Sequence, residues 1–279
     1  MADGFVRSGL LRPDWTNNIN TGLAGWWALR EGCGDKASDI SGKGNTGILT
    51  NGPTWQDGGL RFDGTDDHVL RTVANFRSGD NVGSITVRFK SASTATALSL
   101  VASADAATAN DYMFFGINIA GAVGSVYVQT NTAGVNNQVR TTAQTFNDGV
   151  THTAVLTSNG SAWQIIVDGV NQSLTVVGGS NNGTWFSDIA NRDNFTIGNL
   201  IRSSAIAHFA GAISGVRVFN RTLTVLEAQQ LHQNPNIGLW TPDYTRHYVA
   251  AAAGGAWNSL PYQELSNPLI LPKHVSVAY

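Results

Sequence analysis

The sequence predicts an all-β protein in which two antiparallel sheets pack face to face as a sandwich. Charged residues make up only 13% of the 279 residues, and Glu and Lys, the usual residues of exposed helix faces, are scarce. Short apolar runs alternate with turn sequences such as SGKGN, DGTDD and SNNG, which tolerate positive φ angles. Hydrophobic residues make up 42%, which is enough to form a sizeable core between the sheets.

The elements can be assigned in chain order. Residues 1–21 are polar and show no sustained period, so we expect an extended N-terminal arm. Residues 22–219 form a series of strand-like runs, and in SITVRFK the side chains of Ile85, Val87 and Phe89 share one face. So many short strands are too many for one open sheet, which is why we expect two packed sheets.

One helix is predicted after the last strand. In RTLTVLEAQQLHQNP, Thr224 and Glu227 form a capping box and Pro235 prevents continuation. The apolar side of this helix is marked by two leucines, Leu226 and Leu231. A helix over residues 225–233 is too short to be stable alone in water, so it must pack on the sandwich.

The segment after the helix, residues 235–279, is rich in aromatic residues and poor in charge, the reverse of a disordered tail. Its prolines favour an extended path. We therefore expect an ordered tail that contacts its own sandwich or another subunit. Large aromatic residues and Arg are the usual anchors of interfaces, and the candidate partner contacts are Trp240, Tyr244, Arg246, Tyr248, Trp257 and Tyr262.

Five segments, in this order, resemble one known family. They are GLAGWWALREGCGDKASDISGKGNTGILTNGPTW, LRFDGTDDHV, THTAVLTSNGSAWQIIVDGV, FTIGN and GAISGVRVFNRTLTVLEAQQL. Together they are similar to the laminin-G-like, concanavalin A-like jelly-roll modules. The resemblance implies two curved antiparallel sheets with a short helix after the final strand. The domain organisation is then an arm over residues 1–21, a jelly-roll sandwich over 22–234 and a tail over 235–279.

The resemblance also implies a possible calcium site, because many family members bind Ca²⁺ at the rim of the sandwich. The sequence FDGTDDHV supplies the candidate ligands Asp63, Asp66 and Asp67. The family usually adds an acidic pair from the next-to-last strand, where this chain has Ser214 and Gly215. We therefore expect a strand-to-strand turn, with no metal or other cofactor bound.

Two kinds of sugar chemistry are possible on this scaffold. Glycoside hydrolysis requires two facing carboxylates, and the Glu-x-Asp-x-x-Glu-like motif of the hydrolases is absent, so we expect no enzyme. Sugar binding requires an aromatic platform beside polar groups. The candidates for such a platform are Tyr112, Trp185 and Phe186, and the alternative is that these rings pack in the core.

Other partners are limited by charge and hydropathy. The formal net charge of -2 leaves no basic excess to neutralise phosphates, so we do not expect nucleic acid as a partner. No apolar stretch is long enough to span a membrane, and the N-terminus lacks the apolar region of a secretory signal. We therefore expect a chain made in the cytoplasm and not secreted by a signal peptide.

Two functional hypotheses follow. Both use the sequence LHQNPNIGLWTPDYTRHY, which is similar to the segment that follows concanavalin A-like modules in tailed-bacteriophage virion proteins. The first is a non-enzymatic structural virion protein of a tailed phage, a capsid decoration or cement protein. It would contact the major capsid protein or other virion proteins and form a homotrimer. The second is a carbohydrate-binding, lectin-like module of a tail fibre or baseplate that adsorbs to host glycan.

Overall fold

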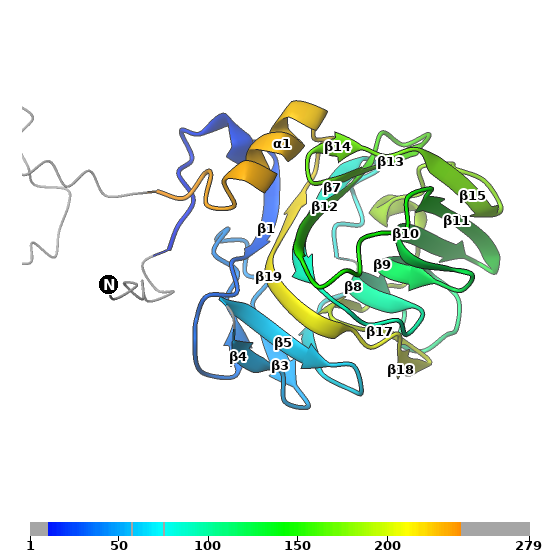
Figure 1. Cartoon of the computed structure of the whole chain (residues 1–279), viewed down its shortest axis with the longest axis horizontal. Coiled ribbons are helices and arrows are strands. Elements are labelled where there is room, and N and C mark those ends of the chain that lie inside the picture. Colours follow the sequence, from blue (N-terminus) through cyan, green and yellow to red (C-terminus); the bar gives the residue numbers. More distant parts are fainter. Residues whose placement is uncertain (1–10, 57, 75, 241–279) are drawn as a thin grey trace, which may run out of the picture. The chain divides into compact units, whose positions relative to one another are not determined.

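The computed structural model describes residues 11–240 except residues 57 and 75, and it shows the predicted two-sheet antiparallel sandwich (Figure 1). One sheet has eight strands, in the order β14 (Val170–Asn171), β13 (Trp163–Val167), β12 (Thr151–Ser158), β7 (Gly83–Lys90), β19 (Ala210–Phe219), β5 (Gly59–Asp63) and β4 (Thr54–Gln56), with β1 (Leu23–Trp27) also paired to β19. The other has nine strands, in the order β15 (Leu174–Gly178), β11 (Val135–Thr141), β10 (Ala122–Thr132), β9 (Tyr112–Ile119), β8 (Leu98–Ala104), β16 (Asn194–Ile197), β6 (His68–Thr72), β3 (Gly47–Thr50) and β2 (Lys36–Ala37). A separate hairpin joins β17 (Leu200–Arg202) and β18 (Ser204–Ile206).

The main core lies between the two sheets, and the alternation of side chains along each strand fills it. Ile85, Val87 and Phe89 of β7 all point into this core, which confirms the face predicted for SITVRFK. Trp27 of β1 joins the two layers, because its ring stacks on Phe195 of β16 with centroids 4.9 Å apart.

A second, smaller core forms on the outer face of the eight-stranded sheet, where α1 (Val225–Gln233) packs. The capping box of Thr224 and Glu227 is present, as predicted. Leu231 is buried against the sheet, but Leu226 is 64% exposed. The apolar side of the helix is therefore formed by Leu231 and Ala228, one helical turn apart, and not by the two leucines.

The described part of the predicted N-terminal arm is not extended. Residues 11–20 fold back and pair with the segment after α1, where Pro13 bridges to Leu239 and the N–H of Trp240 donates to the carbonyl oxygen of Arg12 at 2.9 Å. We call residues 11–20 together with 234–240 the terminal clasp. It forms because Leu11, Ile19, Ile237 and Leu239 add apolar surface to the second core.

The clasp includes one of the predicted partner contacts. The guanidinium of Arg12 lies 4.0 Å above the ring of Trp240, so this tryptophan has an intramolecular contact, and its contact with a partner stays a prediction. The other predicted contacts, Tyr244, Arg246, Tyr248, Trp257 and Tyr262, lie outside the described residues. Within residues 11–240, none of the helices is both long and apolar enough to cross a membrane.

A histidine–aspartate cluster links α1 to β12 of the eight-stranded sheet. The Nδ1 of His152 on β12 lies 2.7 Å from Asp168 Oδ2, and its Nε2 lies 3.1 Å from Asp148 Oδ1. The Nδ1 of His232 on α1 lies 3.3 Å from the other Asp168 oxygen. Because Asp168 accepts its hydrogen bond, the pKa of His152 is raised above the ordinary value, although partial burial opposes this.

This cluster gives a pH-dependent stability. The pKa of His152 is raised by folding, so its stabilising contribution is fully present below about pH 6.5 and is lost as the pH rises through the folded-state pKa. We expect Asp168→Asn to lower the free energy of unfolding by about 1–2 kcal/mol at acidic pH and by less at alkaline pH. Urea unfolding of both proteins at the two pH values measures the difference, and an equal loss at both would contradict it.

Candidate functional site

Two of the three predicted sugar-binding rings lie in the interior. Trp185 and Phe186 are fully buried at the start of a short 3-10 helix, η3 (Phe186–Asp188). The loop turns inward because Asp188 accepts a hydrogen bond from the N–H of Trp185 at 2.7 Å, and Phe186 packs edge-on against Phe76. Neither ring offers a free face to a sugar, so the alternative of core packing holds for both.

Tyr112 is also largely buried, but its hydroxyl group reaches a polar surface. Its ring, on the outer face of the nine-stranded sheet, is covered by the guanidinium of Arg202 at 4.6 Å and does not form a stacking platform. The hydroxyl accepts a hydrogen bond from Gln129 Nε2 at 2.8 Å. Burial raises the pKa of Tyr112, so the hydroxyl remains protonated and can donate at neutral pH.

Strand register brings further polar side chains to this surface. Asn131 of β10 lies opposite Tyr112 of β9 and Asn136 of β11, and Gln129 lies opposite Gln138 of β11. Positions two residues apart on a strand share a face, so these side chains form two adjacent rows on the outer face of the sheet. We call Tyr112, Gln129, Asn131, Asn136 and Gln138 the amide face.

Three amides of this face, those of Gln129, Asn136 and Gln138, are held by one another. Gln129 Nε2 donates to Asn136 Oδ1 at 2.8 Å as well as to Tyr112, and Gln138 Nε2 donates to Gln129 Oε1 at 3.1 Å. Among the described residues, Asn136 Nδ2 and Gln138 Oε1 have no hydrogen-bond partner and are not buried. The network therefore leaves an oriented donor and an oriented acceptor for a ligand.

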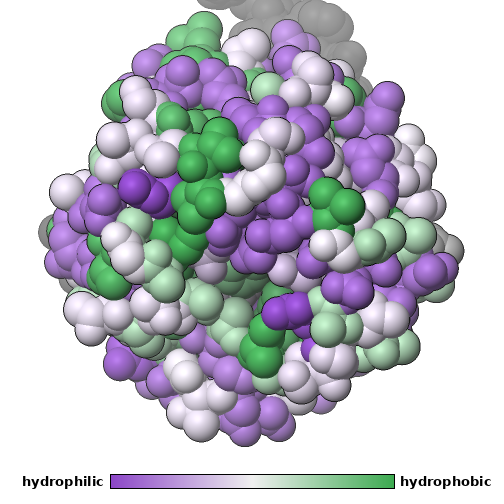
Figure 2. Space-filling view, turned by 90° about the vertical axis from the view of Figure 1, so that its right-hand side faces the viewer, coloured by the Kyte–Doolittle hydropathy of each residue, from purple (hydrophilic) through white to green (hydrophobic). Residues whose placement is uncertain are grey.

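The surroundings of the amide face are mainly polar. Figure 2 shows the molecule from the side on which Figure 1 places β11, β15 and β18, and small apolar patches are scattered there among polar groups. The exposed valines Val135 and Val176 lie on the other face of the sheet, because Val135 is on the same face as the buried Val139 and Val176 is paired with Val139. The amide face therefore offers mainly hydrogen-bonding groups to a ligand.

The structure brings the three predicted calcium ligands together at the end of β5. Carboxylate oxygens of Asp63, Asp66 and Asp67 lie within 4.8 Å of one another. Two of them already have structural roles, since Asp63 Oδ1 accepts from the N–H of Thr65 at 2.7 Å and Asp67 Oδ2 accepts from the N–H of Asp63 at 3.0 Å. Burial raises the pKa of Asp67.

These aspartates supply only part of a calcium coordination sphere. Calcium takes roughly six to eight oxygen ligands, and the residue of β19 opposite Asp63 is Ala210, which offers no side-chain oxygen. Ser214 and Gly215, which stand where the family has its acidic pair, lie further along β19 and line a different cavity. The described side chains therefore fit a hydrogen-bonded turn better than a complete metal site.

We expect chelation to leave the stability unchanged. If no ion is bound to the folded state, EDTA removes no stabilising ligand, and the thermal unfolding temperature stays the same. Thermal unfolding with EDTA, with Ca²⁺ and with Mg²⁺ measures this. A lower unfolding temperature in EDTA that Ca²⁺ alone restores would instead identify Asp63, Asp66 and Asp67 as ligands.

Comparisons with known proteins agree with the observed fold. Residues 63–229 match the family described as the concanavalin A-like lectin/glucanases superfamily. No match was found among curated protein sequences.

Two solved structures show how far the similarity extends. Domain 4 of AbnA, a GH43 extracellular arabinanase from Geobacillus stearothermophilus in complex with arabinotriose, aligns with a TM-score of 0.54 at 16% identity, covering 76% of this chain and 98% of that domain. The Trypanosoma rangeli sialidase in complex with sialic acid aligns with a TM-score of 0.56 at 15% identity, covering 77% of this chain but only 33% of the sialidase. At these identities the likeness shows a shared fold.

Proposed function

Because the chain belongs to the concanavalin A-like lectin/glucanases superfamily, we propose that it is a carbohydrate-binding domain whose ligand lies on the amide face. The observation that carries this proposal is the preformed hydrogen-bond network of Gln129, Gln138, Asn136 and Tyr112. Each hydroxyl group of a sugar both donates and accepts, and side-chain amides offer both functions. Groups that are already oriented lose less entropy when the ligand binds.

The fold likeness supports a sugar as the ligand class. Domain 4 of AbnA is in complex with arabinotriose, a neutral oligosaccharide, and shares the sandwich architecture. This is an analogy at the level of the fold, so it suggests arabinotriose as a first probe and does not identify the natural glycan.

These comparisons favour carbohydrate binding over capsid decoration. Both the family and the arabinotriose-bound domain are associated with sugars, and neither gives support to a phage origin. The virion location, the capsid partner and the homotrimer remain predictions from the sequence alone.

We also propose that the chain binds its glycan without hydrolysing it. The two described glutamates have structural roles, which supports this proposal. Glu31 Oε1 accepts from the N–H of Ser38 at 2.7 Å, and Glu227 caps α1 and pairs with Arg221 at 2.7 Å. A glycosidase would need two carboxylates facing each other across the bound sugar, and neither glutamate lies on the amide face.

Substituting Gln129 tests the proposed site. Gln129→Ala removes the amide that orients Tyr112 and Asn136, so we expect the affinity for a bound oligosaccharide to fall by about tenfold. Isothermal titration calorimetry with arabinotriose, followed by a panel of neutral oligosaccharides, measures it.

A matched control lies on the other sheet. Gln164 is a partly exposed residue of β13, and Gln164→Ala should leave the affinity unchanged. Absence of binding to every oligosaccharide in the panel, or an equal loss in both variants, would argue against the amide face as a glycan site.

A further inference from the structure

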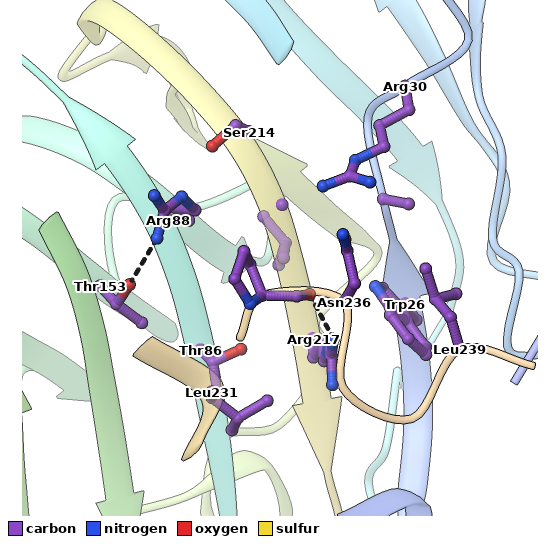
Figure 3. A pocket seen from close by; sticks show the side chains of 14 residues that line it. Trp26, Arg30, Thr86, Arg88, Thr153, Ser214, Arg217, Leu231, Asn236 and Leu239 are labelled. Atoms are coloured by element: carbon purple, nitrogen blue, oxygen red, sulfur yellow. Dashed lines mark hydrogen bonds between the residues drawn. The ribbon is translucent and has the colours of Figure 1, made fainter. Parts of the chain in front are cut away.

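Three arginines surround a small pocket on the outer face of the eight-stranded sheet, on the other sheet from the amide face (Figure 3). Arg217 belongs to β19, Arg88 belongs to β7 and Arg30 follows β1. The pocket has a volume of about 40 Å³ and is closed on one side by α1 and the segment that follows it. We call it the arginine pocket.

Strand register explains why the pocket exists. On β19, Arg217 lies opposite Trp26 of β1, and Gly215 lies opposite Arg88 of β7. A glycine at this position leaves open space beside the arginine. A Cβ atom added to Gly215 would meet nothing closer than the main-chain oxygen of Trp27, at 3.9 Å.

The innermost arginine is incompletely satisfied. Arg217 is only 4% exposed, and its guanidinium lies 3.7 Å above the ring of Trp26. Its Nη2 donates to the carbonyl oxygen of Pro235 at 2.8 Å, but its Nη1 is buried and has no hydrogen-bond partner among the described residues. A buried cationic donor without an acceptor is costly, and such groups normally have a partner.

The charges around the pocket also favour an anionic ligand. In the described part of the chain, none of these three arginines forms an ion pair with a carboxylate. Burial, together with the nearby charge of Arg30, lowers the pKa of Arg217 to about 9, so the guanidinium is still charged at neutral pH. Burial and the charge of Arg88 likewise lower the pKa of Arg30. An anion placed between the arginines would relieve this repulsion.

We propose that the arginine pocket binds a carboxylate group, supplied by an acidic sugar or by another small organic acid. The planar guanidinium fork matches a carboxylate through two parallel hydrogen bonds. A single water molecule needs roughly 15 Å³, so a cavity of about 40 Å³ admits a small ionised group but not a whole sugar ring. Leu231 and Leu239 at the edge of the pocket offer apolar contact to the rest of the ligand.

Calorimetric titration of the full chain at low salt tests the ligand class with four probes. Sodium glucuronate should bind, and methyl glucoside, its neutral counterpart, should bind at least about tenfold more weakly. Affinity for glucuronate should fall severalfold when salt is raised from about 50 mM to about 500 mM. Acetate binding as tightly as glucuronate would identify a simple organic acid as the ligand, and weaker acetate binding would identify an acidic sugar. Tighter binding of inorganic phosphate than of either carboxylate would overturn the assignment.

Two variants test the pocket by different means. Arg88→Gln removes one charge, and Gly215→Leu fills the open space without removing any charge; each should weaken glucuronate binding by about tenfold or more. Arg61→Gln, on the exposed surface of β5, removes one charge outside the pocket and should bind like the wild type. Thermal unfolding confirms that each variant is folded.

The two proposed sites can fail separately. Gln129→Ala should retain glucuronate binding, and Arg88→Gln should retain binding to a neutral oligosaccharide. The carboxylate assignment is wrong if glucuronate does not bind the wild type, or if it binds Gly215→Leu and Arg88→Gln as tightly as Arg61→Gln.

Discussion

Replacing Trp27 by alanine is expected to lower the free energy of unfolding by about 4 kcal/mol. The indole ring is only 1% exposed and stacks on Phe195 of the opposite sheet, so its removal leaves a cavity between the two layers. The substitution also leaves the carbonyl oxygen of Asn45 without the hydrogen bond that it accepts from the indole N–H at 2.8 Å. Urea unfolding followed by circular dichroism measures the loss.

Two variants separate the causes of this effect. Trp27→Phe keeps most of the ring but removes the N–H, so its loss should be close to that of one buried hydrogen bond, about 1–2 kcal/mol. Trp15 is 57% exposed, and Trp15→Ala should change the stability by no more than about 0.5 kcal/mol. A Trp27→Ala protein as stable as Trp15→Ala would show that the two sheets do not pack through this ring.

The second large effect is expected at Arg192, a buried cation held by neutral acceptors. It is 1% exposed and donates to the carbonyl oxygens of Ile189 and Phe186 at 3.1 and 2.7 Å, and to the hydroxyl group of Ser103 at 2.8 Å. Arg192→Ala leaves these acceptors without donors, so we expect a loss of about 3–5 kcal/mol. Urea unfolding again provides the measurement.

Arg192→Lys tests whether charge or geometry matters at this position. Lysine keeps the positive charge but cannot reach three acceptors in the fixed fork geometry of arginine, so most of the loss should persist. Arg61→Ala on the surface of β5 serves as the control for removing an arginine. Full stability in Arg192→Lys would show that the charge alone is sufficient.

The parts of the fold that were predicted correctly depend on local signals. The alternation in SITVRFK identifies the buried face of β7, and the spacing of Thr224, Glu227 and Pro235 fixes both ends of α1. These signals lie within one strand or one helix. The terminal clasp was missed because its contacts join residues separated by more than 200 positions, as in the hydrogen bond from Asn20 Nδ2 to the carbonyl oxygen of Gly238.

The candidate sites depend on strand pairing, which the sequence does not display. Gln129 and Gln138 become neighbours only because β10 and β11 pair in one particular register. The same is true of Arg88 and Gly215 on β7 and β19. Conversely, the Gly- and Asn-rich sequence around Trp185 is typical of an exposed loop, yet tertiary packing buries the ring completely. Of the predicted sugar contacts, only the hydroxyl group of Tyr112 belongs to the amide face.

The terminal clasp also has a consequence for how this unit can be joined to other polypeptides. Arg12 and Trp240 are in contact, so a chain that enters the sandwich at the clasp leaves it at nearly the same point. In Figure 1 this point lies beside α1, at the opposite end of the molecule from β11 and β15. Such a unit can be inserted between two adjacent loop residues of a host protein without forcing them apart. Strand β11, which carries Asn136 and Gln138 of the amide face, would then lie at the end of the sandwich away from the host.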